Sequence, residues 1–138
     1  MKLSEKSERL KVVAGEEARR LGHRYVGTEH LLLAVSHDEN EKVCEILVEL
    51  GLDPADLRSQ VDAFVIKSGV PKTDEDIPMS PRAEAAFERS LVEAGQLECP
   101  AAEPEHVLLA MAEDEDGVAA RVLEVFGIDY ASIRRFLI

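Results

Sequence analysis

The stretch "YVGTEHLLLA" (residues 25–34) returns 76 positions later as "AAEPEHVLLA" (residues 101–110). In both stretches a Glu-His pair comes directly before a run of apolar residues. The first pair is Glu29 and His30, and the second begins at Glu105. Such a repetition is typical either of a duplicated chemical site or of a duplicated structural unit.

The match at this offset extends over most of the chain without a gap. Identical residues fall on one another at Ser4 and Ser80, Leu47 and Leu123, Gly51 and Gly127, and Asp53 and Asp129. We therefore predict one domain over residues 1–138, which consists of repeat one (residues 3–66), a linker (residues 67–79) and repeat two (residues 80–138).

Helix signals divide repeat one into four segments, of which the first two precede residue 36. Ser4 predicts an N-cap, and apolar residues at helical spacing follow it up to Gly22. Thr28 predicts the cap of a second, short helix. Its run "HLLLAV" (residues 30–35) is apolar on nearly every side, so we expect this helix to be central and buried.

Two further helices are predicted in the rest of repeat one. Apolar residues at positions i, i+3, i+4 and i+7 predict the third helix, and these are Val43, Ile46, Leu47 and Leu50. Gly51 then ends it, while Asp53 and Pro54 predict the cap and first residue of a fourth helix. The predicted inner face of that helix consists of Leu57, Val61, Phe64 and Val65.

Repeat two carries the same helix signals, and the sequence contains no convincing alternating pattern of a strand. The predicted fold is therefore all-α, with two tandem four-helix repeats that are related by pseudo-twofold symmetry. About eight helices would form one compact domain.

The composition excludes several classes of partner. The formal net charge is −12, from 28 acidic and 16 basic residues, and such a surface repels nucleic acid and anionic lipid. No apolar run approaches the roughly 18 residues that a membrane span needs, and the first residues lack the apolar stretch of a secretory signal. Cys44 and Cys99 lie far apart in the sequence, so we expect reduced thiols and a cytoplasmic protein.

A metal-dependent hydrolase built on His30, His37 and Glu29 is an alternative that the spacing disfavours. Zinc-binding helices usually present two histidines four residues apart, whereas these two are seven apart. In repeat two, Glu113 stands at the position that corresponds to His37. We therefore predict no catalytic residues, no metal site and no cofactor.

The repeated Glu-His pair allows a structural and a functional interpretation. In the first, the Glu suits the positive end of the helix dipole and the His forms a hydrogen bond near the helix start. In the second, the helices that start at Ser4 and Thr28 lie close together. One then offers backbone N–H groups to an anion, and Glu29 offers a carboxylate to a guanidinium or amine.

The residues also carry a family resemblance. "EEARRLGHRYVGTEHLLLAV" (residues 16–35) resembles the amino-terminal domain of Clp-type AAA+ protein unfoldases of the ClpA/ClpC group. "SPRAEAAFERSLVEA" (residues 80–94) and "DGVAARVLEVFGI" (residues 116–128) resemble the second repeat of that domain. The resemblance implies an eight-helix, non-catalytic domain that receives protein substrates and adaptor proteins for a hexameric ATP-driven ring.

In some ClpC-type members this domain also binds phosphorylated arginine, a degradation mark, once per repeat. In these sites the Glu holds the guanidinium, and the start of the first helix of the repeat helps to hold the phosphate. The resemblance implies a first site at Glu29 with Thr28 and Ser4, and a second site at Glu105 with Ser80 and Arg82.

Repeat two departs from the family pattern at several positions. The expected G-T-E-H reads "EPEH" (residues 103–106), and the expected L-G-H reads "LEC" (residues 97–99). Glu84 and Ala85 stand where the family often has basic residues. Because these changes add negative charge around the second site, we expect at most one strong phosphoarginine site, that of Glu29.

No Walker A motif occurs in the chain, so unfolding activity requires an AAA+ ring in the same chain or in a separate one. The leading prediction is a substrate- and adaptor-binding domain of a Clp ATP-dependent unfoldase and protease system. The alternative is a free-standing regulator with the same fold, which competes for substrates or adaptors.

Overall fold

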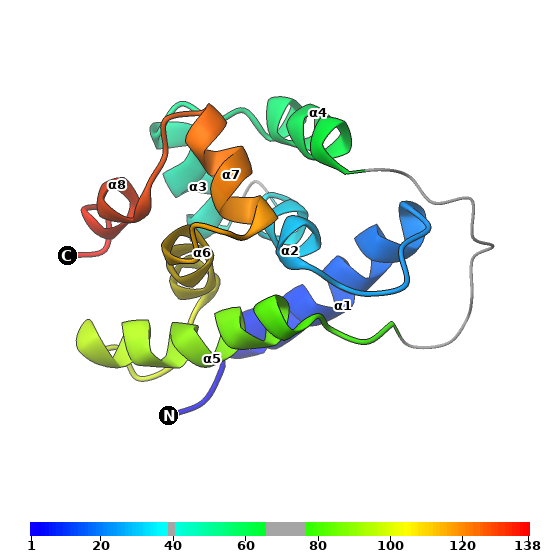
Figure 1. Cartoon of the computed structure of the whole chain (residues 1–138). Helices are drawn as coiled ribbons and strands as arrows, with labels where there is room; N and C mark the ends of the chain where they lie inside the picture. Colours follow the sequence, from blue (N-terminus) through cyan, green and yellow to red (C-terminus); the bar gives the residue numbers. More distant parts are fainter. Residues whose placement is uncertain (39–40, 66–76) are drawn as a thin grey trace.

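A computed structural model describes residues 1–38, 41–65 and 77–138 of the chain. These residues form eight α-helices and no strand (Figure 1): α1 (Glu5–Arg20), α2 (Thr28–Val35), α3 (Lys42–Glu49), α4 (Pro54–Phe64), α5 (Pro81–Gln96), α6 (Pro104–Glu113), α7 (Val118–Val125) and α8 (Tyr130–Arg134). The all-α prediction is confirmed. Most of the predicted linker falls outside the described residues, and the division into two repeats and a linker stays a prediction.

Each helix of the second half begins 76 residues after its counterpart in the first half. The counterparts are α1 and α5, α2 and α6, α3 and α7, and α4 and α8. Helices α1 and α5 each have 16 residues, and α3 and α7 each have 8. The repetition in the sequence is therefore a repetition of helices.

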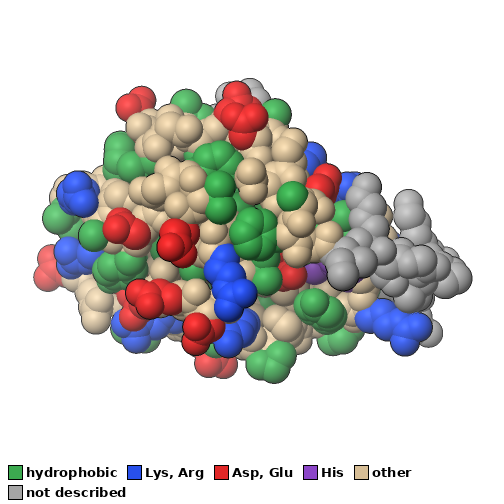
Figure 2. All heavy atoms as spheres, turned by 45° about the horizontal axis from the view of Figure 1, so that its top comes forward, with side chains coloured by type: hydrophobic (Ala, Val, Ile, Leu, Met, Phe, Trp, Pro, Cys, Tyr) green, Lys and Arg blue, Asp and Glu red, His purple; other side chains and the backbone are tan. Residues whose placement is uncertain are grey.

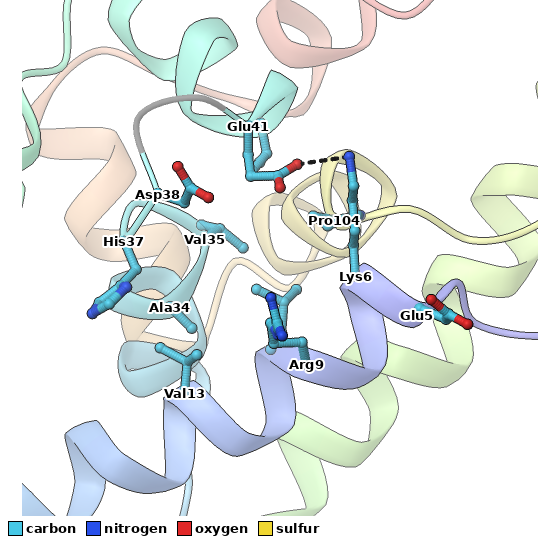
Figure 3. A pocket seen from close by; sticks show the side chains of 12 residues that line it. Glu5, Lys6, Arg9, Val13, Ala34, Val35, His37, Asp38, Glu41 and Pro104 are labelled. Carbon is cyan, nitrogen blue, oxygen red and sulfur yellow. Dashed lines mark ion pairs between the residues drawn. The ribbon is translucent and has the colours of Figure 1, made fainter.

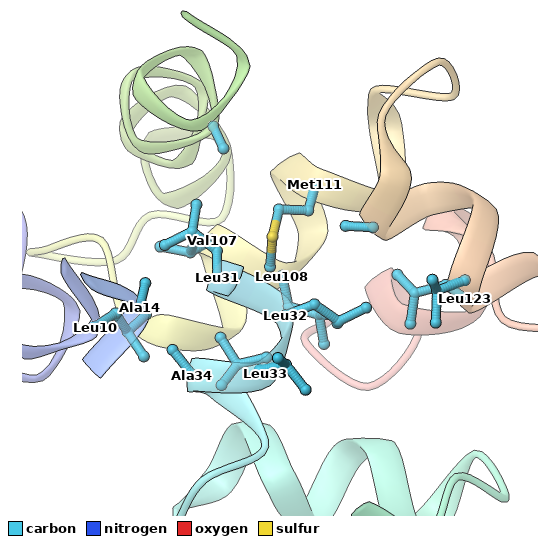
Figure 4. Packing of buried hydrophobic residues seen from close by; sticks show 14 of the residues in the cluster. Leu10, Ala14, Leu31, Leu32, Leu33, Ala34, Val107, Leu108, Met111 and Leu123 are labelled. Carbon is cyan, nitrogen blue, oxygen red and sulfur yellow. The ribbon is translucent and has the colours of Figure 1, made fainter. Parts of the chain in front are cut away.

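Helices α2 and α6 form the centre of the core. Every residue of α2 is buried, and so is every residue of α6 up to Ala112. Figure 1 shows this pair between α1 and α5 on one side and α4 and α7 on the other. Leu32 and Leu108 belong to one hydrophobic cluster to which both halves contribute (Figure 4). The prediction of a central, buried second helix is confirmed.

Side-chain caps fix the starts of several helices. Oγ of Ser4 accepts a hydrogen bond from the N–H of Ser7 at 3.1 Å, and Oγ of Ser80 accepts one from Ala83 at 3.1 Å. The carboxylate of Asp53 caps α4. These caps satisfy N–H groups that a helix start leaves without a partner. The predicted caps at Ser4 and Asp53 are confirmed.

Two local predictions are wrong. Gly27, with extended backbone, occupies the N-cap position of α2, and Thr28 is the first helical residue. Phe64 is 44% exposed, although Leu57 and Val61 on the same face of α4 are fully buried. Phe64 is the last residue of α4.

Backbone hydrogen bonds join the two repeats at two points. Val26 and Met79 form one parallel bridge, and Leu3 and Ala102 form the other. Next to the first bridge, the N–H of Ser80 donates to the carbonyl of Val26 at 2.8 Å. Met79 lies 76 positions after Leu3, and Ala102 lies 76 positions after Val26. The two bridges are therefore equivalent positions of the two repeats, as twofold symmetry requires. Consequently the start of α5 lies at the entry to α2, and the start of α1 lies at the entry to α6.

Candidate functional site

The starts of α2 and α5 share one pocket of about 360 Å³. Thr28 and Glu29 line this pocket from repeat one, and Ser80 and Arg82 line it from repeat two. We call it the Glu29 site. The site exists because the backbone bridge at Val26 holds the two helix starts next to each other.

The carboxylate of Glu29 lies folded back over the backbone of Gly27. The Glu29 side chain is only 7% exposed, and a Cβ built on Gly27 would collide with its Oε1. The φ angle of Gly27 is −102°, which any residue adopts, so glycine matters here because it leaves space for the Glu29 carboxylate in this pose. Gly27 was not among the predicted site residues. The available signal was the replacement of this glycine by Glu103 in the second motif.

His30 closes the start of α2. It is fully buried, and its Nδ1 accepts a hydrogen bond from the N–H of Gly27 at 2.8 Å. The neutral ring therefore carries its proton on Nε2 and donates it to Nδ1 of His23, 2.7 Å away. Burial, with a smaller contribution from His23, lowers the pKa of His30 to about 4.

The histidine of the second motif does the same. Nδ1 of His106 accepts from the N–H of Glu103 at 2.8 Å, and burial lowers the pKa of His106. For the histidines, the structural interpretation of the repeated pair is therefore confirmed.

Thr28 has a structural role at a helix start of the other repeat. Its Oγ1 accepts a hydrogen bond from the N–H of Ala119 at 3.3 Å. Ala119 lies in the first turn of α7, and the N-cap of α7 is Gly117, which offers no side-chain oxygen. Thr28 therefore satisfies an N–H group of α7 while it lines the Glu29 site.

The second-repeat side of the Glu29 site offers one guanidinium and one backbone donor. Nη1 of Arg82 lies 2.6 Å from Oδ1 of Asp114, and this hydrogen bond raises the pKa of Arg82. Pro81 has no N–H, and the N–H of Ala83 is bonded to the Ser80 hydroxyl. Within the described part of the chain, the N–H of Arg82 is therefore the donor that remains at this end of α5.

Glu105 lies in a more acidic setting at the start of α1. Its Oε2 is 3.7 Å from Nζ of Lys42, while Nζ of Lys6 is 3.0 Å from Oε2 of Glu41. The hydrogen bond to Glu41 raises the pKa of Lys6, with smaller contributions from Glu103 and Glu105. Oε1 of Glu103 is buried and has no hydrogen-bond partner among the described residues. Three carboxylates thus surround two lysines, and we call this region the Glu105 site.

The predicted grouping of these residues by repeat is wrong. Ser4 was predicted beside Glu29 and Ser80 beside Glu105, whereas the two backbone bridges exchange these partners. Helix α1 has 16 residues and is about 24 Å long. Because His23 follows its end and contacts His30, Ser4 lies at the far end of α1 from the Glu29 site. The ligand-binding roles of these residues stay predictions.

The geometry offers no ligand set for the metal-dependent alternative. Both ring nitrogens of His30 already have partners within the chain. His37 is exposed and follows the opposite end of α2. No group of three His, Cys, Asp or Glu residues that could hold a metal ion occurs in residues 1–38, 41–65 and 77–138.

Charged side chains of both signs share the surface. Figure 2 shows acidic and basic side chains interspersed on one face, with hydrophobic side chains between them. On this face the acidic excess therefore does not form one continuous field. Over the described residues, no helix has the length and apolar character that crossing a bilayer requires.

One family match decides what kind of domain this is. A model of the Clp repeat (R) N-terminal domain covers residues 2–126, and a second, overlapping match covers residues 93–137. The chain belongs to the Clp repeat N-terminal domain family. The resemblance to ClpA/ClpC proteins is confirmed, and as a Clp repeat N-terminal domain the chain is a binding module without catalytic function.

Curated relatives contain this domain as a small part of a longer protein. Chloroplast chaperone protein ClpC1 of Arabidopsis thaliana is 39% identical over 133 residues, which are 96% of this chain and 14% of ClpC1. A chloroplast ClpA homologue of Brassica napus is 39% identical over 133 residues, which are 96% of this chain and 15% of that homologue. The ClpA homologue of Porphyra purpurea is 38% identical over 96% of this chain and 16% of its own length.

Solved structures share the Clp repeat fold at low sequence identity. The N-terminal domain of ClpD from Arabidopsis thaliana has a TM-score of 0.75 at 23% identity, with 98% of this chain and 94% of that chain covered. The Hsp104 N-terminal domain from Candida albicans has a TM-score of 0.77 at 17% identity, with 99% and 89% covered. A ClpV N-domain in complex with a VipB peptide has a TM-score of 0.75 at 16% identity, with 96% and 82% covered. At these identities the likeness shows the fold alone.

Proposed function

We propose that this chain binds substrate and adaptor proteins for a cytoplasmic Clp-type AAA+ unfoldase, and that the Glu29 site takes the phosphorylated arginine side chain of a marked protein. Family membership supports the first part, as does the VipB peptide on the ClpV N-domain. The observation that carries the second part is the nearly buried Glu29 carboxylate in one pocket with the start of α5.

The two sides of the Glu29 site match the two charges of phosphoarginine. Its guanidinium is bonded to a phosphoryl group, so a receptor needs a carboxylate next to an anion site. Glu29 offers the carboxylate, which can accept two parallel hydrogen bonds from a guanidinium. The start of α5, with the N–H of Arg82 and the positive end of a 16-residue helix, suits the phosphoryl group. The half-exposed Arg82 side chain can exchange Asp114 for that group.

The Glu105 site suits phosphoarginine less well. Glu103 stands where Gly27 stands in the first motif, so repeat two has a side chain at the position that the Glu29 carboxylate requires to be empty in repeat one. Glu103 and Glu41 also place negative charge near the position of a phosphoryl group. One strong site per chain is therefore expected.

Calorimetric titration with free phosphoarginine tests this proposal, with arginine and inorganic phosphate as control ligands. Wild type is expected to show one strong site. Glu29→Ala is expected to weaken binding roughly tenfold to a hundredfold, because a charge-assisted contact is lost. The matched variant Glu105→Ala is expected to bind as wild type does. Two equal sites, or binding that Glu29→Ala leaves unchanged, would contradict the proposal.

A second matched pair tests the phosphoryl half of the site. Ser80→Ala and Ser4→Ala each remove an N-cap, so each costs about 0.5–2 kcal/mol of stability. Only Ser80→Ala is expected to weaken phosphoarginine binding, because the start of α5 lines the Glu29 site and the start of α1 does not. Equal weakening by both variants would mean that the start of α5 does not hold the phosphoryl group.

A further inference from the structure

A groove of about 480 Å³ lies between the first half of α1 and the end of α2 (Figure 3). We call it the α1 groove. Its apolar lining includes Leu10 and Val13 of α1 and Val35 of α2, and Pro104 of α6 also lines it. It shares no lining residue with the Glu29 site. Its volume falls within the roughly 300–1,000 Å³ that is typical of ligand pockets.

The corresponding groove of the second repeat is closed by ion pairs. Each of its lining residues is related by the 76-residue offset to one that lines the α1 groove, but its volume is only about 230 Å³. Arg82 pairs with Asp114 at 2.6 Å, and Arg89 pairs with Glu113 at 2.8 Å. These side chains line the groove, so the space between them is taken by the pairs.

The α1 groove lacks the residues of the second of these ion pairs. Val13 stands at the position of Arg89, and His37 stands at the position of Glu113. Arg9 stands at the position of Ala85, so this groove has gained a cation of its own. The same helix frame is therefore open in one repeat, where Arg9 adds a guanidinium to a lining that also contains Glu5, Asp38 and Glu41, and closed in the other.

The guanidinium of Arg9 is the basic charge that a ligand in the α1 groove would meet. Nζ of Lys6 is already paired with Glu41 at 3.0 Å. Among residues 1–38, 41–65 and 77–138, none forms an ion pair with Arg9. Figure 3 shows the Arg9 side chain in the middle of the lining residues, while the carboxylate of Glu5 is turned away; Asp38 has an interaction within the chain.

We propose that the α1 groove binds a polypeptide segment in which an aliphatic side chain stands next to an aspartate or glutamate. The aliphatic group lies on the apolar lining and the carboxylate pairs with Arg9. This inference rests on the proposed function, since it assumes that the chain binds proteins. It deepens that function, because it assigns a second contact surface and an acidic, aliphatic class of segment to it.

Fluorescence anisotropy with the intact chain tests this proposal. The probe is a fluorescein-labelled peptide with two leucines flanked by aspartates. One comparison peptide has lysines in place of the aspartates, and another has glycines in place of the leucines. Only the first peptide is expected to bind well, and the proposal is overturned if wild type does not bind it.

A double substitution copies the closed groove into the open one. Val13→Arg with His37→Glu recreates the pair of Arg89 and Glu113, which the fold already accommodates in repeat two. Peptide affinity is expected to fall at least about tenfold, while the melting curve stays cooperative. The matched control is Arg89→Val with Glu113→His, which is expected to leave the affinity unchanged. Wild-type affinity in the folded double variant overturns the proposal.

Arg9→Glu keeps the test independent of the double variant, because Arg9 is exposed and its replacement leaves the core intact. The aspartate peptide is expected to bind roughly tenfold more weakly to this variant, and the lysine peptide more tightly. An unchanged preference overturns the proposal.

Phosphoarginine titration separates the two proposals. A wrong groove leaves Glu29-dependent phosphoarginine binding intact, whereas failure at the Glu29 site leaves peptide binding to the α1 groove intact.

Discussion

At the scale of single residues, the carboxylate of Glu29 and the backbone of Gly27 lie so close that no Cβ fits between them. The missing side chain of Gly27 provides the room for the buried carboxylate in this pose. The pose therefore depends on two residues, of which only Glu29 carries charge.

Gly27→Ala is expected to move the Glu29 carboxylate without unfolding the chain. The φ of −102° suits alanine, and the collision involves the flexible end of a side chain, so the free energy of unfolding should change by less than about 1 kcal/mol. Phosphoarginine affinity should fall, as calorimetry would show. Gly15→Ala is the control, since its Cβ would meet nothing within 4 Å and its ligand affinity should match wild type.

His30 predicts a pH dependence of stability. Its pKa is about 4 in the folded chain and 6.5 in the unfolded chain, so the unfolded chain takes up the proton first as the pH falls. Its stabilising contribution is present above pH 6.5 and is lost towards pH 4, by roughly 3 kcal/mol in total.

Urea unfolding at several pH values would measure this contribution. The stability difference between wild type and His30→Gln should change between pH 6.5 and pH 4. His37→Gln, at an exposed position, should follow wild type throughout. Parallel curves for wild type and His30→Gln would refute the assignment.

At the scale of helices, α2 and α6 are buried on all sides and therefore carry the core. Leu32→Ala and Leu108→Ala are each expected to lower the free energy of unfolding by roughly 2–5 kcal/mol, because each leaves a cavity at a fully buried position. Val48→Ala is the control, since Val48 on α3 is 54% exposed, and its effect should stay within about 0.5 kcal/mol. Urea unfolding followed by circular dichroism would measure all three, and wild-type stability of both leucine variants would contradict the central position of these helices.

Local chemistry explains which helix features could be predicted from the sequence. The caps at Ser4 and Asp53 depend on residues within one turn, so the sequence contains the whole signal. Thr28 could not be assigned in this way, because its hydroxyl serves α7, which lies 91 residues further along the chain. Phe64 has the spacing of a core residue, but it is the last residue of α4 and is exposed.

The candidate site could be predicted residue by residue but not as an assembly. The motif identified Glu29, and the resemblance identified Ser80 and Arg82, which do line one pocket. Which helix start meets which glutamate is decided by the bridges at Val26 and Ala102. No local pattern in a single sequence shows that the helix start of one repeat meets the glutamate of the other, so the predicted grouping by repeat was wrong.

At the scale of the whole molecule, both halves contribute to one core and to both sites. Helix α2 packs against α1 of its own half and also against α6 and α7 of the other half, so neither half buries its central helix alone. Fragments 1–65 and 77–138 are therefore each expected to lack a cooperative unfolding transition when alone. An equimolar mixture should regain helical circular dichroism and the transition, and cooperative unfolding of one isolated fragment would contradict this expectation.

The exchanged bridges also constrain how the two copies can diverge during evolution. A substitution at Ser80 or Arg82 is inherited with repeat two, yet it changes the pocket that contains Glu29 of repeat one. A substitution at Lys6 is inherited with repeat one and changes the surroundings of Glu105. The duplicated unit is therefore not the unit that forms the Glu29 site or the Glu105 site. A change in the surroundings of either glutamate can come from the gene segment of the other repeat.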